Sequence, residues 1–200
     1  MTNNYAKIVQ DNLKKLFDNL SKDLAMKLPA RQENKGFFFD AFGEACIIEP
    51  GKITLGECEA PSVMGILLSL YALNVSSDIC VPTPFRAFKS FPDSMPYTGA
   101  FAINTEQALL PYVDKIEKEK EKIYRALKGE DTPAETAGDF AFVVYPLPKV
   151  ALCYIFYEAD EDFPASVTCL YNNNADRFMP LDGLADVGEY TSKKIINLIS

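Results

Sequence analysis

The sequence predicts an α+β fold, in which a mostly antiparallel sheet packs with long amphipathic helices. Three observations support this prediction. Apolar residues recur at helical spacing near the N-terminus. Short runs rich in β-formers, separated by turn residues, cluster in two parts of the chain. Further helical patterns lie between and after these clusters, so helices and strands are segregated. We interpret residues 1–200 as one domain of this class.

We expect residues 3–28 to form one long helix. Asn3 or Asn4 is suited to cap its start, and Pro29 marks its end. The apolar positions of its inner face are Tyr5, Ile8, Val9, Leu13, Leu16, Phe17, Leu20 and Leu24.

Residues 36–60 are expected to form a β meander. Short strand-like runs occupy residues 37–42, 45–48 and 52–55. Gly43-Glu44 and Pro50-Gly51 suit the turns between them, because proline fixes φ and glycine accepts a positive φ. The apolar stretch 63–73 then predicts a buried helix.

Residues 80–101 form an unusual segment in which prolines alternate with aromatic residues. Proline opposes regular structure, whereas the aromatic content opposes disorder. We therefore expect an ordered loop that places its rings against the core. The residues concerned are Pro82, Pro84, Pro92 and Pro96, with Phe85, Phe88, Phe91, Tyr97 and Phe101. A second long helix is expected to begin at Asn104 or Thr105 and to reach Leu127, and Pro111 is expected either to kink it or to separate a first turn.

The C-terminal region, residues 138–199, carries the strongest strand signals. Runs 140–145 and 150–157 are apolar and are joined by residues 146–149, which is short enough for an antiparallel hairpin. The continuous apolar character of 150–157 predicts a central strand buried on both faces. Residues 166–171 are expected to form a third strand. A final helix is expected from Pro180 to Leu198.

Charge and residue usage exclude several classes of function. The 28 acidic and 20 basic residues give a net charge of −8, which opposes binding to nucleic acids and to anionic membranes. The chain has no histidine, so Ser–His and Cys–His nucleophile pairs and histidine-ligated metals are excluded. We expect no cofactor, no iron–sulfur cluster and no structural zinc, because the cysteines are scattered. They are Cys46, Cys58, Cys80, Cys153 and Cys169.

The same features predict a cytoplasmic protein. The odd number of scattered cysteines is typical of reduced thiols. The first residues are polar, and no apolar run approaches the length of a membrane span.

Two features are candidate ligand-binding sites. Asp160, Glu161 and Asp162 follow the most hydrophobic strand, where carboxylates could bind a hard cation or simply keep the strand end in water. Arg86 lies among aromatic residues and could hold an anion or pin the loop through a carboxylate. We expect Arg86 and Tyr97 to meet the acidic turn in one cleft. No residue is assigned a catalytic or metal-ligating role.

One set of residues in the C-terminal part of the chain matches a family pattern. These residues are Gly138-Asp139, 146–150, 158–166 and Leu170, with 66–68, Phe85-Arg86 and the stretch from Pro92 to Phe101. In these residues the chain resembles an uncharacterised family of domains of unknown function from anaerobic bacteria and archaea. The Asp-Glu-x-Phe-Pro-Ala stretch is the most specific part of the resemblance. The chain departs from the family pattern at Asn172, where aspartate is common, and near Val81, where tryptophan is common.

Some members of this family carry a four-cysteine iron–sulfur module, which this sequence lacks. The resemblance therefore implies a setting of low-potential redox or corrinoid-linked metabolism. It implies no particular reaction.

Three hypotheses follow from the sequence. The first is a non-catalytic accessory domain that binds a ligand or a partner, such as a redox or corrinoid enzyme. The second is a metal-assisted enzyme that uses the acidic turn Asp160–Asp162, with Arg86 as anion clamp; this requires the carboxylates to converge in a cleft. The third is a structural interaction protein with a large exposed apolar patch.

Overall fold

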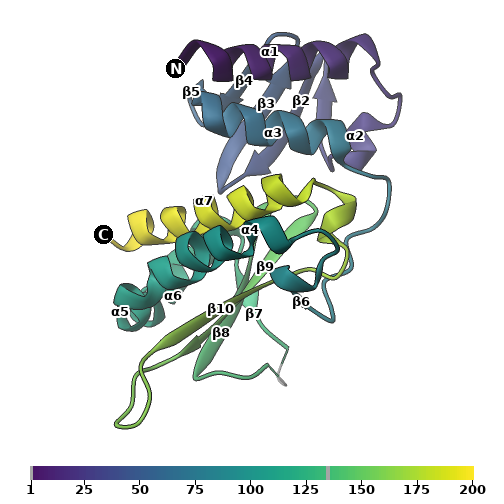
Figure 1. The fold of residues 1–200 in the computed structure, drawn as a ribbon. Helices are drawn as coiled ribbons and strands as arrows, with labels where there is room; N and C mark the ends of the chain where they lie inside the picture. The colour runs from purple at the N-terminus through teal and green to yellow at the C-terminus, as the bar shows by residue number, and fades with distance from the viewer. Residues whose placement is uncertain (1, 134–135) are drawn as a thin grey trace.

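A computed structural model describes residues 2–133 and 136–200 of the chain. Its first half holds a five-stranded antiparallel sheet in the order β1-β2-β3-β4-β5. The helices α1 and α3 lie side by side across one face of this sheet (Figure 1). The elements of this half are α1 (Thr2–Asp18), α2 (Leu24–Lys27), β1 (Arg31–Glu33), β2 (Gly36–Ala41), β3 (Glu44–Glu49), β4 (Lys52–Leu55), β5 (Cys58–Glu59) and α3 (Ser62–Asn74).

The second half holds another five-stranded antiparallel sheet, in the order β6-β10-β9-β8-β7. The long helix α7 packs against α3 of the first half and against the helical chain that connects β6 to β7 (Figure 1). The elements are β6 (Arg86–Ala87), η1 (Phe88–Ser90), α4 (Met95–Phe101), η2 (Ala102–Glu106), η3 (Gln107–Tyr112), α5 (Val113–Lys118), α6 (Lys120–Leu127), β7 (Glu130–Asp131), β8 (Phe140–Leu147), β9 (Val150–Tyr157), β10 (Ser166–Tyr171), η4 (Ala175–Arg177) and α7 (Leu181–Ile199).

The predicted α+β class is confirmed, and so is the C-terminal hairpin. Strands β8 and β9 pair antiparallel, with Ala141 opposite Ile155 and Val143 opposite Cys153. Strand β9 is central in its sheet and is buried along its whole length except at Tyr157. Its apolar sequence therefore reflects burial on both faces.

One continuous hydrophobic core runs through both halves, from Val9 in α1 to Ile199 in α7. It contains the side of the second sheet that faces α7. A smaller apolar layer covers the opposite side of that sheet, around Val143, Cys153 and Ile155, with Phe85 and Tyr145 packed on it.

The prediction of one helix over residues 3–28 is wrong, because α1 ends at Asp18 and only one further turn, α2, follows. Between them the Ser21 hydroxyl donates to the Asp23 carboxylate, which also pairs with Lys27 at 3.1 Å. Serine and aspartate side chains that bond locally compete with the helical ladder. Leu20, expected on the inner face, is left 42% exposed.

The second long helix also differs from the prediction. The helical chain begins at Met95, inside the stretch expected to be a loop, and passes through a π-turn and a 3₁₀ segment before α5 and α6. Pro111 lies within the 3₁₀ segment, where its missing N–H removes a helical hydrogen bond. The expected burial of aromatic rings is confirmed for Phe88, Phe91 and Phe101, which pack around Tyr171.

Candidate functional site

The structure does not bring Arg86 and the acidic turn together. In the sheet, Arg86 on β6 lies opposite Tyr171, the last residue of β10. The acidic turn precedes Ser166, the first residue of that strand. The five-residue rise between these positions is about 17 Å. The prediction of one shared cleft is therefore wrong.

Arg86 instead holds its own loop in place. Its guanidinium donates to the backbone oxygens of Asn173, at 3.1 Å, and Ser90, at 2.9 Å. The same group lies 4.2 Å from the centroid of the Phe91 ring. Arg86 therefore pins the loop through backbone carbonyl groups, and not through a carboxylate as the sequence suggested.

Replacing Arg86 by lysine or alanine should therefore cost stability. Lysine cannot reproduce two bonds made by a planar fork together with ring stacking, so we expect a loss of about 1–2 kcal/mol for Arg86→Lys and somewhat more for Arg86→Ala. Urea unfolding measures both losses. A matched substitution of the exposed Arg125 by lysine should change little. Equal unfolding midpoints for Arg86→Lys and wild type would contradict the assigned role.

Tyr97 lies apart from both features, on α4. It lines a small hollow against α7 together with Asp182, Asp186 and Glu189. Burial raises the pKa of Asp186, and the charge of Glu189 raises it further.

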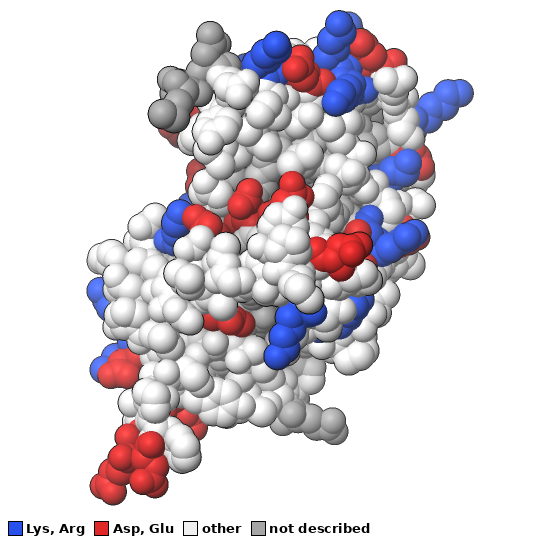
Figure 2. All heavy atoms as spheres, in the orientation of Figure 1, with Lys and Arg blue, Asp and Glu red and all other residues white. Residues whose placement is uncertain are grey.

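The acidic turn forms the exposed tip of the β9–β10 hairpin. Figure 1 shows this hairpin extending away from the body of the molecule, and Figure 2 shows acidic side chains gathered at its tip. The Asp160 carboxylate accepts the backbone N–H groups of Asp162, at 2.8 Å, and Phe163, at 2.7 Å. Glu161 and Asp162 are exposed. In the part of the chain that the structure describes, no three acidic or thiol side chains are grouped to hold a metal ion.

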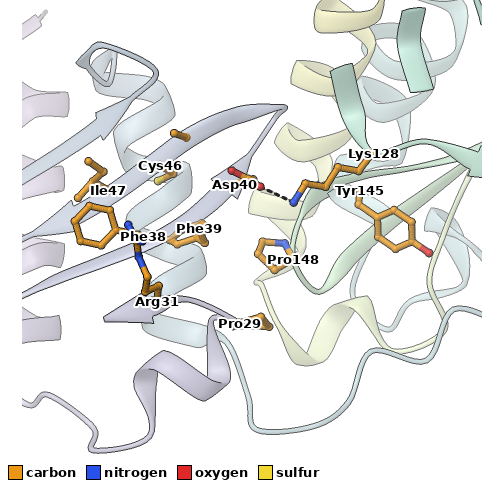
Figure 3. Close-up of a pocket in the computed structure, with 11 residues that line it drawn as sticks. Pro29, Arg31, Phe38, Phe39, Asp40, Cys46, Ile47, Lys128, Tyr145 and Pro148 are labelled. Carbon is orange, nitrogen blue, oxygen red and sulfur yellow. Dashed lines mark ion pairs between the residues drawn. The ribbon is translucent and has the colours of Figure 1, made fainter. Parts of the chain in front are cut away.

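A different site lies where the two halves meet. A cavity of about 790 Å³ opens on the face of the first sheet that α1 and α3 leave uncovered. Figure 3 shows side chains from both halves around it. The first half contributes Pro29, Arg31, Phe38, Phe39, Asp40, Ala45, Cys46 and Ile47, and the second half contributes Lys128, Tyr145 and Pro148.

The walls of this cavity are mostly apolar, with a few placed charges. Lys128 forms an ion pair of 2.5 Å with Asp40 across the junction (Figure 3). Arg31 lies 5.3 Å from the centroid of the Phe38 ring. Both charged groups are largely exposed, so each can exchange its present partner for a ligand at small cost.

Cys46 borders the cavity through its backbone, because strand alternation turns its side chain to the opposite face of β3, into the hydrophobic core. Burial there raises the pKa of its thiol to about 12. The Tyr145 hydroxyl donates to the Glu130 carboxylate at 2.5 Å. Burial raises the pKa of Tyr145, and the hydrogen bond to Glu130, followed by the charge of that group, raises it further.

The turn between β2 and β3 sets the geometry of the junction. The backbone N–H of Phe42 donates to the Pro146 oxygen at 2.7 Å, and Gly43 lies directly against the backbone of Ala126. Lys128 caps α6 with a left-handed backbone, φ 53°, which ends the helix beside Asp40. The alternation of the meander places Phe38 and Ile47 on the uncovered face, but nothing in the sequence indicates that Lys128 reaches Asp40.

Comparison with known protein families finds one match that covers most of the chain. The family described as "Domain of unknown function (DUF3786)" matches residues 21–194, a range that begins after α1. No curated protein and no solved structure matches the chain. Within the described residues, no helix is long and apolar enough to cross a membrane.

Proposed function

The chain belongs to the DUF3786 family, and we propose that it is a non-catalytic accessory domain that binds a small ligand in the cavity between its two sheets. The observation that carries the proposal is the cavity itself. It lies at the junction of the two halves, is about 790 Å³ in volume, and combines apolar and aromatic walls with a few charged groups. Ligand sites commonly have this size, position and composition.

The chemistry around the cavity favours binding over catalysis. Its cations stand in ion pairs, at 3.1 Å for Arg31 with Glu33 and 2.5 Å for Lys128 with Asp40. The Cys46 thiol lies on the other face of β3, within the hydrophobic core, and does not face the cavity. Groups in these states can orient a ligand but offer no activated nucleophile.

The biological setting is part of the proposal. The family resemblance suggests anaerobic bacteria and archaea, and it suggests that some relatives carry an iron–sulfur module. We therefore propose that the domain serves a redox or corrinoid enzyme as its partner.

The alternative expected from the sequence, a metal-assisted enzyme that uses Asp160–Asp162, has less support. Its carboxylates lie at an exposed hairpin tip, and the Asp160 carboxylate is occupied by backbone N–H groups. A catalytic metal site needs carboxylates that converge in a sheltered cleft.

The test is to identify what the protein carries from its own cells. Wild-type protein is purified anaerobically, and its bound small molecules and proteins are identified by mass spectrometry. We expect a small molecule that is lost from Ala45→Trp, because the new side chain fills the cavity from β3. Thr54→Trp is the control, since it lies on the neighbouring strand and the same sheet face but outside the cavity. Retention of the molecule by Ala45→Trp would place its binding elsewhere and refute the proposal.

A further inference from the structure

A second cavity, of about 390 Å³, lies in the other half of the molecule and shares no wall with the first. It opens where the helical chain crosses the edge of the second sheet. The residues that carry its chemistry are Phe88, Lys89, Thr98, Phe101, Glu106 and Cys169.

Glu106 is the half-buried carboxylate of this cavity. One of its oxygens accepts the backbone N–H of Cys169 at 2.9 Å. This contact exists because β6 is only two residues long and pairs with Leu170 and Tyr171, which leaves the Cys169 N–H free for a side chain. The hydrogen bond fixes the carboxylate in the cavity wall, and among the described residues its second oxygen accepts no hydrogen bond.

The backbone at Glu106 is itself unusual. Glu106 ends the π-helical turn Ala102–Glu106, a rare conformation that recurs at functional sites. Burial raises the pKa of Glu106, with partial relief from the Cys169 N–H and from the charge of Lys89. A cationic donor that enters the cavity would stabilise the charged form of this carboxylate.

Lys89 supplies the opposite charge. It lies in η1 on the wall of the same cavity, and in the described residues it forms no ion pair, with Glu106 or with any other carboxylate. The cavity thus combines a carboxylate held by a hydrogen bond with a separate, exposed cation. The stacked rings of Phe88 and Phe101, with centroids 4.5 Å apart, line the same cavity.

We propose that this cavity binds a small zwitterion of the free amino acid class. The ammonium group of the ligand pairs with Glu106, its carboxylate pairs with Lys89, and its side chain packs against Phe88 and Phe101. This site is additional to the one between the sheets and does not depend on it.

The probes are the common free amino acids, each with its N-acetyl derivative and its methyl ester. Binding is followed by the backbone amide signals of Thr168 and Cys169 in ¹⁵N–¹H NMR spectra of the whole chain. We expect at least one free amino acid to shift these signals saturably. The N-acetyl form loses the ammonium and the ester loses the carboxylate, so each should bind about tenfold more weakly or worse.

The variants Glu106→Gln and Lys89→Met should each weaken binding by a similar factor. Glutamine still accepts the Cys169 N–H, so this variant removes the charge and keeps the contact. Lys122→Met, on the exposed side of α6, is the matched control for loss of a lysine and should bind as wild type does. Lys89 is exposed, so Lys89→Met keeps the test decisive if the Glu106 variant fails to fold.

The proposal is overturned if no free amino acid shifts the signals at millimolar concentration. It is equally overturned if the ester or N-acetyl form binds as well as the parent, or if Lys89→Met binds normally. Ala45→Trp, which blocks the cavity between the sheets, should leave this binding intact. The two proposed sites can therefore fail separately.

Discussion

Replacing Gly43 by alanine should destabilise the protein by roughly 3 kcal/mol or more. A Cβ atom at this position would lie 2.0 Å from the backbone oxygen of Ala126, which cannot move without displacing the end of α6. The backbone at Gly43 also has φ +75°, a conformation that side chains disfavour. Steric overlap and backbone strain therefore add at one residue.

The matched control is Gly99→Ala. Gly99 lies in α4, and apart from its chain neighbours and its own helix backbone no atom lies within 4 Å of the added carbon, so alanine should stabilise the helix by up to about 1 kcal/mol. Urea unfolding of both variants measures the contrast. The assigned packing at the β2–β3 turn is incorrect if Gly43→Ala unfolds at the same urea concentration as wild type.

The effect of Gly43→Ala should extend to the cavity between the sheets. Asp40 lies on the strand that leads into this turn, and it forms the ion pair with Lys128 across the junction. A turn forced away from Ala126 would separate these walls. We therefore expect this variant to bind its ligand with lower affinity, even under conditions where the protein remains folded.

The sequence predicted those elements whose signals are local. Strands β8, β9 and β10 follow from apolar runs bounded by turn residues, and the meander follows from short runs around Gly43 and Gly51. Each of these signals lies within a few residues of the structure it determines.

The helices were harder to predict where the backbone departs from the α-helix. The apolar spacing of α1 continues past Asp18 into Leu20 and Leu24, but side-chain bonds between Ser21 and Asp23 interrupt the ladder. The π-turn at Ala102–Glu106 has no recognisable residue pattern. It is stabilised by its packing against α7 and β10, which lie far away in sequence.

The candidate site could not be predicted because it depends on distant pairings. Arg86 was expected near Asp160, but β6 pairs with the far end of β10, and only the sheet register reveals which end that is. In the same way, Asp40 and Lys128 are neighbours only because the β2–β3 turn packs against the end of α6. Charge and aromatic content indicated candidate residues, whereas the topology decided which of them meet.

Replacing Ile155 by aspartate should lower the free energy of unfolding by about 4 kcal/mol. Ile155 lies in the central strand β9 and is 9% exposed, in the apolar layer with Val143 and Cys153 on the side of the sheet away from α7. Burial raises the pKa of Cys153 on the same face to about 12, so this layer already disfavours a charged group.

Tyr157→Asp is the matched control, because Tyr157 points to the same face two residues further along β9 but is 40% exposed. The Tyr157→Asp variant should lose about 1 kcal/mol or less in free energy of unfolding. The penalty at Ile155 should shrink as the pH falls toward about 3.9, since a buried carboxyl has a raised pKa and costs less when protonated. Urea unfolding at neutral and acidic pH measures both effects. If Ile155→Asp is no less stable than Tyr157→Asp at neutral pH, the layer around Ile155 is open to water and β9 is not buried on both faces.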